Sequence, residues 1–156
     1  TVTSHCPNTG SMLGLIKKGY KVWLSKSNNP KRKLKYTLQI IEDSKSKVGV
    51  NTHLTNKIAL DGFNKGIINI FKNFDSIKQE VKFGENTRFD FLIHKGRKKC
   101  FIEVKNVTLS RRKGLAEFPD AITSRGLKHL QELLKAKKKG FEIFILYIIK
   151  VYWNKL

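Results

Sequence analysis

The stretch RFDFLIHKGRKKCFIEVK, residues 88–105, alternates apolar and polar side chains on either side of a short basic turn. This period of two is typical of a β-hairpin with one face in the core. With residues 95–98 as the loop, the strands place Asp90 opposite Glu103, His94 opposite Lys99 and Arg88 opposite Lys105. The other face of the hairpin is then entirely apolar: Phe89, Phe91, Ile93, Cys100, Ile102 and Val104. Because a slip of one residue would turn that face to solvent, the pattern constrains the register.

Two opposed carboxylates need a positive charge between them. Across a sheet they repel by a few tenths to ~1 kcal/mol, and each raises the pKa of the other. Lys105 follows Glu103 on the same face, and a divalent ion with oxygen ligands is a second candidate. With both present, Asp90 and Glu103 would hold Mg²⁺ (or Mn²⁺) against a phosphate, and Lys105 would orient a water or stabilise the developing charge. Such an arrangement would catalyse phosphodiester hydrolysis. The alternative is a structural role, a salt-bridged hairpin in which Lys105 and Arg88 neutralise the acids.

The front of the chain predicts a small β unit. Residues 20–41 alternate around a basic, turn-rich stretch, residues 25–33, which predicts two strands. Two strands alone are marginal, so we expect an incomplete barrel or a hairpin that leans on the rest of the protein. The polar residues 42–47 are expected to form a linker.

Downstream, helices and strands alternate. Asn56 could cap a helix whose apolar positions follow a 3.6-residue rhythm. These positions are Ile58, Ala59, Phe63, Ile67, Ile70 and Phe71. Strands are expected at 77–83, 88–94 and 100–105. A long loop is expected at 106–123.

A second helix and a last strand complete the pattern. The helix, residues 124–139, is expected to pack through Leu127, Leu130 and Leu134. Residues 141–151 are nearly all apolar, as in a strand of a covered sheet. The order of elements predicts an α/β fold whose last crossover is parallel and right-handed.

Composition narrows the class of partner. The chain has 156 residues, and its 40% hydrophobic content excludes a disordered polymer. Lys and Arg number 32 against 12 Asp and Glu, a formal charge of +20 that favours a polyanion such as nucleic acid. An AT-rich coding sequence is the alternative source of the lysine excess.

Cysteine usage and hydropathy indicate a cytoplasmic protein. Cys6 and Cys100 are far apart and have no metal-ligand spacing, which argues against a disulfide framework and a zinc site. The first ten residues lack the basic and apolar regions of a secretory signal. The longest apolar run, residues 143–149, is too short to cross a bilayer, so no membrane partner is expected.

Short motifs along nearly the whole chain resemble a known family. Asp90 with Glu103-Val104-Lys105 looks like the PD-(D/E)xK nuclease signature. Longer segments resemble, in the right order, the sugar fermentation stimulation protein (SfsA) family. They are CPNTGSM (6–12), NPKRK (29–33), VGVNT (48–52), RFDFL (88–92), EVKNVTL (103–109), FPDAIT (118–123) and RGLKHL (125–130).

The resemblance implies two domains and a DNA-binding activity. A partial OB-like β barrel, residues 1–44, would precede a C-terminally short PD-(D/E)xK nuclease-like mixed sheet flanked by helices, residues 45–156. It also implies a regulatory link to sugar (maltose) utilisation. Asp90 and Glu103 match the metal-binding acids and Lys105 the catalytic lysine. Asp61 stands where the family tends to have a glutamate and is expected as a further ligand.

Several basic residues are candidates for contacts with nucleic-acid phosphates. They are Lys31, Arg32, Lys33, Arg88, Arg111, Arg112, Arg125, Lys128 and His129. A solvated helix face is the alternative for His129, and Glu80 is a candidate peripheral acid of the site.

These observations favour a DNA-binding protein with a divalent-metal-dependent nuclease-type site. A non-catalytic DNA-binding transcriptional regulator would keep the acids as a structural ion-pair cluster. A basic RNA-binding domain would use the same charge without chemistry. DNA is favoured over RNA as the partner.

Overall fold

The computed structural model describes residues 1–70, 73–85, 87–121 and 123–153, with the side chain of Arg125 outside that description. The chain groups into two compact units. Unit 1 contains Thr1–Thr55, Asn106–Ala121 and the segment from Ile148 onward. Unit 2 contains Asn56–Lys105 and the segment that ends at Tyr147. The expected domain bounds of 1–44 and 45–156 stay a prediction.

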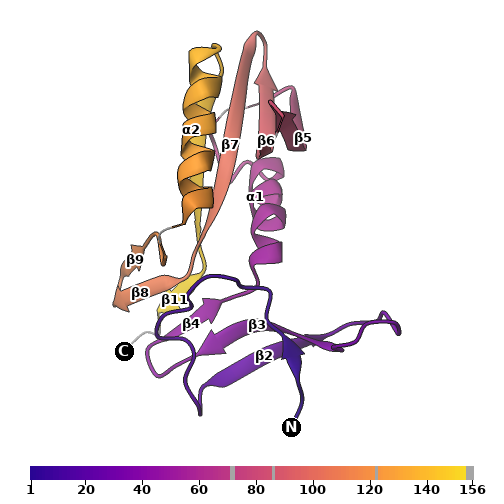
Figure 1. The fold of residues 1–156 in the computed structure, drawn as a ribbon, viewed down its shortest axis with the longest axis vertical. Helices are drawn as coiled ribbons and strands as arrows, with labels where there is room; N and C mark the ends of the chain where they lie inside the picture. The colour runs from indigo at the N-terminus through magenta and orange to yellow at the C-terminus, as the bar shows by residue number, and fades with distance from the viewer. Residues whose placement is uncertain (71–72, 86, 122, 154–156) are drawn as a thin grey trace. The chain divides into compact units, whose positions relative to one another are not determined.

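Unit 1 is built on a five-stranded sheet. Its strands are β1 (Ser4–His5), β2 (Lys21–Lys26), β3 (Tyr36–Glu42), β4 (Ser46–Gly49) and β11 (Val151–Trp153). β3 pairs in parallel with β1 and antiparallel with β2 and β4, and β4 pairs antiparallel with β11 (Figure 1). The core of this unit is formed by Met12, Leu15, Ile41, Val48, Val50 and Val151.

The two strands predicted between residues 20 and 41 are present, but the linker at residues 42–47 is not. That segment is the end of β3, a tight turn and the start of β4. Asp43 makes the turn, because its Oδ1 accepts the backbone N–H groups of Lys45 and Ser46 at 2.8 and 2.6 Å. Polarity here marks a turn inside one sheet.

Unit 2 contains a four-stranded sheet with the order β10-β7-β6-β5. Its strands are β5 (Ser76–Phe83), β6 (Thr87–Lys95), β7 (Lys98–Val107) and β10 (Glu142–Ile149). The predicted hairpin register is confirmed from Phe91↔Ile102 to His94↔Lys99. The loop is shorter than expected, because Lys95 still pairs with Lys98 and Gly96 turns the chain at a φ of 55°.

The alternation of the hairpin breaks at Asp90. Phe91 lies 5.6 Å from Phe63, ring centroid to ring centroid, as the apolar face predicts. Phe89, expected on that same face, instead clusters with Leu92 and with Phe101, whose ring centroid is 4.8 Å away. The described ladder between β6 and β7 ends at Phe91↔Ile102, so the regular pairing expected for Asp90 with Glu103 and for Arg88 with Lys105 is wrong.

Helix α2 (Ser124–Lys138) covers this phenylalanine cluster through Leu133 and Ala136 (Figure 1). The expected packing stripe was wrong, since Leu127, Leu130 and Leu134 are 59%, 45% and 56% exposed. Both stripes have helical spacing. The stripe that packs contains Leu133 and Ala136. It also carries His129, one turn before Leu133, and His129 contacts Glu103.

Helix α1 (Thr55–Asn64) follows a 3-10 turn, η1 (Thr52–Leu54). Asn51 caps η1 by accepting the N–H of His53, so the expected cap at Asn56 is wrong. Ala59 and Phe63 are buried as predicted. The helix ends early, with Ile58 and Ile67 exposed and Ile70 beyond its end. Phe71 lies outside the described residues.

The long loop expected at 106–123 contains a hairpin, β8 (Leu109–Arg112) with β9 (Leu115–Glu117). The single strand expected at 141–151 is two strands, because Lys150 separates β10 from β11, which joins the sheet of unit 1. β10 lies beside β7, while the orientation and handedness of the crossover stay predictions.

Among the described residues, the helices are too short or too polar to span a bilayer.

Candidate active site

Asp90 is held by two hydrogen bonds at the point where the ladder of β6 stops. Its Oδ2 accepts the backbone N–H of Val104 at 2.7 Å, so the carboxylate replaces a backbone partner for β7. Its Oδ1 accepts Nδ2 of Asn56, on α1, at 2.8 Å. Helix and hairpin thus fix both oxygens of the half-buried Asp90.

Burial is the first reason that the pKa of Asp90 is raised above its ordinary value. The negative charges of Glu103 and Glu80 raise it further, whereas the hydrogen bonds from Val104 and Asn56 lower it. The two acids predicted to repel therefore do so. A positive charge placed beside them would lower that pKa again.

Glu103, on β7, is only 3% exposed. Its Oε1 accepts Nζ of Lys105 at 2.7 Å and also contacts Nδ1 of His129 on α2. Within the described part of the chain, its Oε2 is buried and has no hydrogen-bond partner. A buried carboxylate oxygen without a donor is costly, so this atom is suited to a cation as its partner.

Glu80, on β5, takes part through its charge. The ladder between β5 and β6 pairs Gln79 with Phe91 and Val81 with Phe89, and it skips the position where Glu80 would face Asp90. Glu80 has a φ of 52°, a left-handed conformation that costs a non-glycine residue about 1 kcal/mol or more. The two strands that flank Asp90, β5 and β7, therefore both depart from regular pairing with β6 at this position.

The donor set partly fits a divalent ion. Asp90 and Glu103 offer hard oxygen ligands, one of them the partnerless Oε2, as Mg²⁺ or Mn²⁺ prefers. Asp61 is not gathered with them, since it is exposed on α1 and pairs with Lys65 at 2.8 Å. Across residues 1–153, apart from those left undescribed, His, Cys, Asp and Glu side chains form no group of three or more able to share one ion. Of the three predicted ligands, Asp90 and Glu103 are the two that lie together.

The predicted phosphate-contact residues are spread over both units. In unit 1, Lys31 and Lys33 are exposed, Arg32 is half-buried, and Arg112 is exposed. Arg111 is already engaged by Glu117, whose carboxylate accepts its Nε at 3.0 Å. This pairing is the main reason that the pKa of Glu117 falls to about 2.

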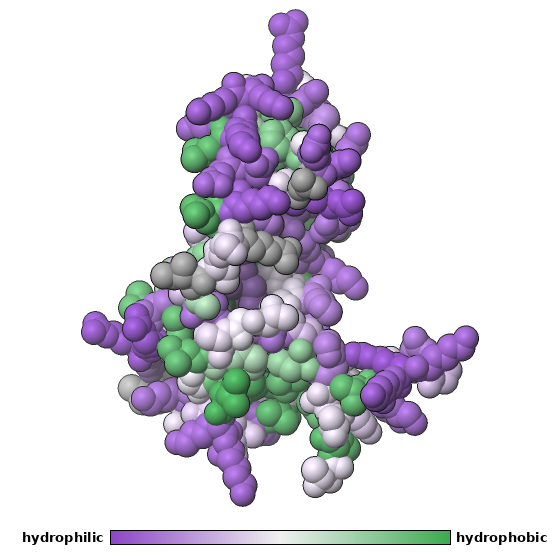
Figure 2. Space-filling model, in the orientation of Figure 1, coloured by the Kyte–Doolittle hydropathy of each residue, from purple (hydrophilic) through white to green (hydrophobic). Residues whose placement is uncertain are grey.

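In unit 2, Arg88 and Lys128 are exposed, whereas His129 turns toward Glu103. The side chain of Arg125 lies outside the described part of the structure. Hydrophilic side chains cover most of the visible face over β6, β7 and α2 (Figure 2). Exposed Arg88 and Lys128 contribute positive charge to this unit, as contact with a polyanion requires.

One positioning residue escaped prediction. The sequence pattern predicts Asn56 as a helix cap, yet its amide holds Asp90. The two residues are 34 positions apart, and no spacing pattern links them. His129, expected as a phosphate contact or on a solvated helix face, instead contacts Glu103.

The chain matches two family models, which together cover most of its length. Residues 1–50 match the SfsA N-terminal OB domain, and residues 53–153 match the sugar fermentation stimulation protein RE domain. A sugar fermentation stimulation protein homolog of Pelagibacter ubique is 55% identical over 150 residues, which are 96% of this chain and 65% of the relative. A homolog of Maricaulis maris is 46% identical and is covered to 64%.

A solved structure has the same fold. Pyrococcus furiosus SfsA in complex with Ca²⁺ aligns with a TM-score of 0.84 at 26% identity, over 96% of this chain and 63% of that one. The chain thus spans 63–65% of the length of these relatives.

Proposed function

Because the chain belongs to the sugar fermentation stimulation protein (SfsA) family, with an N-terminal OB domain and a restriction-endonuclease-like domain, we propose that it hydrolyses phosphodiester bonds of DNA with a divalent ion. The observation that carries the proposal is the buried Oε2 of Glu103, which has no partner among the described residues and lies on a carboxylate that repels Asp90. We place the activity in the cytoplasm, linked to sugar (maltose) utilisation.

Asp90 and Glu103 are the ligands in this proposal. Asn56 and the N–H of Val104 keep Asp90 in one orientation, and Lys105 and His129 hold Oε1 of Glu103 so that Oε2 is left for the ion. When bound, Mg²⁺ or Mn²⁺ would supply positive charge to the phosphate and lower the pKa of a water. The Ca²⁺ of the Pyrococcus furiosus structure supports a divalent ion of this kind.

Lys105 is the second functional group. Its side chain is 19% exposed and bonds Glu103 at 2.7 Å, so the ammonium group is anchored next to the ligand oxygens. An ammonium fixed there would stabilise the negative charge that develops on a phosphoryl oxygen, or would orient the attacking water. His129 is a positioning residue, since it contacts Glu103.

A nuclease assay tests the reaction. Purified chain would be incubated with single-stranded DNA, double-stranded DNA and RNA, each with Mg²⁺, Mn²⁺ or a chelator. We expect metal-dependent cleavage of DNA that falls at least about a hundredfold in Asp90→Asn and Glu103→Gln. Glu85→Gln, which removes an exposed acid of the same unit, is the control and should cut normally. Cutting by all three variants at the wild-type rate would refute the assignment.

Metal binding is tested separately by thermal unfolding. A ligand that binds only the folded state raises the melting temperature by mass action. We expect millimolar Mg²⁺ or Mn²⁺ to raise it in the wild type and in Glu85→Gln, and not in Glu103→Gln.

A second candidate is a non-catalytic DNA-binding regulator. It is favoured by the ion pairs that Lys105 and His129 make with Glu103, together with the absence, among described residues, of a third metal-binding side chain. It predicts salt-sensitive DNA retention with no cleavage and no metal-linked stabilisation.

A further inference from the structure

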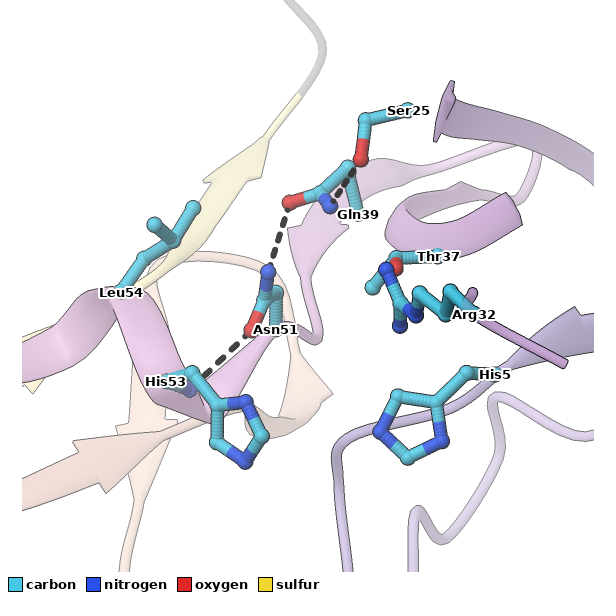
Figure 3. A pocket seen from close by; sticks show the side chains of 8 residues that line it. All are labelled: His5, Ser25, Arg32, Thr37, Gln39, Asn51, His53 and Leu54. Atoms are coloured by element: carbon cyan, nitrogen blue, oxygen red, sulfur yellow. Dashed lines mark hydrogen bonds between the residues drawn. The ribbon is translucent and has the colours of Figure 1, made fainter. Parts of the chain in front are cut away.

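The wall of the open cavity of unit 1 is a chain of hydrogen bonds between its own side chains. The cavity has a volume of about 500 Å³, and Gln39 donates from Nε2 to Ser25 at 2.8 Å and accepts Nδ2 of Asn51 at 2.9 Å (Figure 3). Asn51 in turn accepts the N–H of His53 at 3.0 Å. Unit 2 presents a different kind of surface, because its helix α2 exposes large apolar side chains.

These side chains lie on one flank of α2, away from the face that packs on the sheet. Leu127, Leu130 and Leu134 form this leucine flank, and all three are exposed. The helix packs through Leu133 and Ala136. At 3.6 residues per turn, the leucine flank points to one side of that packed face.

The opposite flank of α2 shows which way the leucine flank points. There, Lys128 and Lys135 line an open cavity together with Phe83 of β5 and Thr87 of β6. β5 and β6 therefore lie on the lysine side of the helix. Because the order of the sheet is β10-β7-β6-β5, the leucine flank lies on the side of β10 (Figure 1).

β10 is an edge strand without the usual protection of an edge. Within the part of the chain that the structure describes, it has a neighbouring strand on one side only. Its first residue, Glu142, is its one charged residue and pairs with Lys98 at 3.3 Å. The other edge strand, β5, carries Lys78, Glu80 and Lys82 and is irregular at Glu80. Charges and irregularities of this kind keep other strands from adding to an edge, so β10 is the edge that accepts one.

A strand added beside β10 would lie next to the leucine flank. Ile143 and Ile145 of β10 pack with Leu133 and Ala136 of α2, so alternate side chains of β10 point toward the helix. Neighbouring strands are about 4.8 Å apart, and side chains that are level with one another point to the same face. Alternate side chains of the added strand would therefore contact the leucines.

Charge indicates the chemistry of the partner. Lys137 and Lys138 follow Leu134 by three and four residues, so they border the leucine flank at its C-terminal end, and both are exposed. A second copy of this chain, with its formal charge of +20, would bring further cations to this surface. A partner with carboxylates beside its apolar residues would instead complement these lysines.

We propose that the edge of β10 and the leucine flank bind an extended segment of a partner protein. The segment adds to β10 as a strand, its alternate apolar side chains contact the leucine flank, and carboxylates at its end lie beside Lys137 and Lys138. Backbone hydrogen bonds to β10 provide affinity, and the leucines select apolar side chains. This surface is separate from the proposed hydrolysis, since it uses neither Asp90 nor Glu103.

Fluorescence anisotropy of a labelled peptide tests the proposal. The probe has a glutamate at each end and alternating valine and threonine between them, and it is titrated with the full chain. A chelator is present throughout, so that failure of the metal site cannot affect the result. We expect saturable binding that weakens about tenfold or more when serine replaces valine.

Two methylated peptides test whether the segment adds as a strand. One carries N-methyl groups on its valine amides, and the other carries them on its threonine amides. Only every second N–H of a strand points to its neighbour. We therefore expect one methylated peptide to lose binding about tenfold or more and the other to bind as the probe does.

Variants of the chain locate the surface. Leu130→Gln and Leu134→Gln should each weaken binding about tenfold. Ile58→Gln is the matched control, because Ile58 of α1 and Leu130 are both 45% exposed, and it should change binding less than about twofold. Lys137→Gln should weaken binding about threefold, and Lys82→Gln, at the opposite edge of the sheet, should not. Thermal unfolding checks that each variant is folded.

Selective losses in the leucine variants, with one of the two methylated peptides blocked, support the proposal. No saturable binding of the probe below about 1 mM overturns it. Equal binding of the serine peptide, equal binding of both methylated peptides, or an equal loss in Ile58→Gln overturns it too.

Two other occupants are examined by sedimentation velocity and by flotation with phosphatidylglycerol vesicles. Self-association, or vesicle binding, that Leu130→Gln abolishes and that the probe does not compete with would assign the leucine flank to a second copy or to a membrane surface. Either result overturns the proposal.

Discussion

Two half-buried lysines, Lys105 in unit 2 and Lys150 in unit 1, have opposite surroundings. Lys105 in unit 2 pairs with the carboxylate of Glu103 at 2.7 Å. Lys150 in unit 1 donates from Nζ to the backbone oxygen of Asn51 at 2.6 Å, and burial lowers its pKa to about 8. No carboxylate of the described residues lies within ion-pair distance of Lys150.

The difference separates two ways of holding charge. The centre in unit 2 has an excess of acid and neutralises it with its own ammonium and imidazole groups, so a metal ion is a natural further partner. In unit 1, Lys150 has a backbone oxygen as its partner and no carboxylate among the described residues, so the burial of its ammonium group is not compensated by a charge. Four predictions test this contrast.

The largest effect is expected from Glu103→Ala. The change leaves Lys105 without its buried counter-ion and removes the contact of His129, which should lower the free energy of unfolding by about 3 kcal/mol. Urea unfolding followed by circular dichroism measures it. Glu85→Ala, at an exposed turn, should stay within about 0.5 kcal/mol. A loss below about 1 kcal/mol in Glu103→Ala would show that the cluster does not stabilise unit 2.

Lys150→Met should raise the free energy of unfolding, the opposite of the effect expected for Glu103→Ala. The lowered pKa means that the folded state holds the proton less tightly than the unfolded state, so wild-type stability rises as pH increases from about 8 through the ordinary lysine pKa. At neutral pH the penalty is complete. Allowing for solvent screening of a partly exposed group, we expect the variant to gain about 1 kcal/mol there.

The measurement is the free energy of unfolding at several pH values for both proteins. The advantage of Lys150→Met should shrink as pH rises. An advantage that does not change with pH would refute burial of the ammonium as its cause.

Asn56→Ala should act through Asp90. Loss of the amide removes a hydrogen bond to the charged carboxylate, so the pKa of Asp90 should rise further. The free energy of unfolding of the variant should fall by about 1 kcal/mol at a pH above that pKa. It should fall by less at lower pH, where the carboxyl is already protonated. Carboxyl ¹³C titration and urea unfolding follow the two effects. Asn64→Ala, in the same helix and exposed, should leave the titration of Asp90 unchanged.

The smallest effect is expected at the surface of unit 1. Glu117 titrates at about 2 chiefly because Arg111 bonds it, so Arg111→Gln should move that titration up toward the ordinary glutamate value. The stabilisation from this pair is present above the unfolded pKa and is lost as pH falls through about 2. Arg112→Gln removes only the weakest cause and should shift the titration less. Equal shifts in both variants would contradict the bonding geometry.

Strong periodicity predicted some elements well. The register of the hairpin was fixed by its alternating apolar residues, and Phe91, Ile93, Cys100 and Ile102 are buried as expected. Alternation could not reveal that Asp90 takes the place of a backbone partner, because that depends on Val104 and on Asn56 of a distant helix.

Two patterns with helical spacing could not be separated in α2. The leucines at 127, 130 and 134 are more apolar than His129, Leu133 and Ala136, yet the second set packs. The contact of His129 with Glu103 belongs to tertiary structure, and helical periodicity carries no information about it. The cavity of unit 1 was likewise invisible, since its members come from five separate segments of the chain.

The place of β11 has a consequence for the order in which the protein forms. β11 spans Val151–Trp153 and pairs with β4, about a hundred residues earlier, while Val151 joins the core of Val48 and Val50. During synthesis on the ribosome, β4 therefore keeps an unpaired edge until the rest of unit 2 has been translated. Chaperones are expected to bind the nascent chain mainly at that unpaired edge.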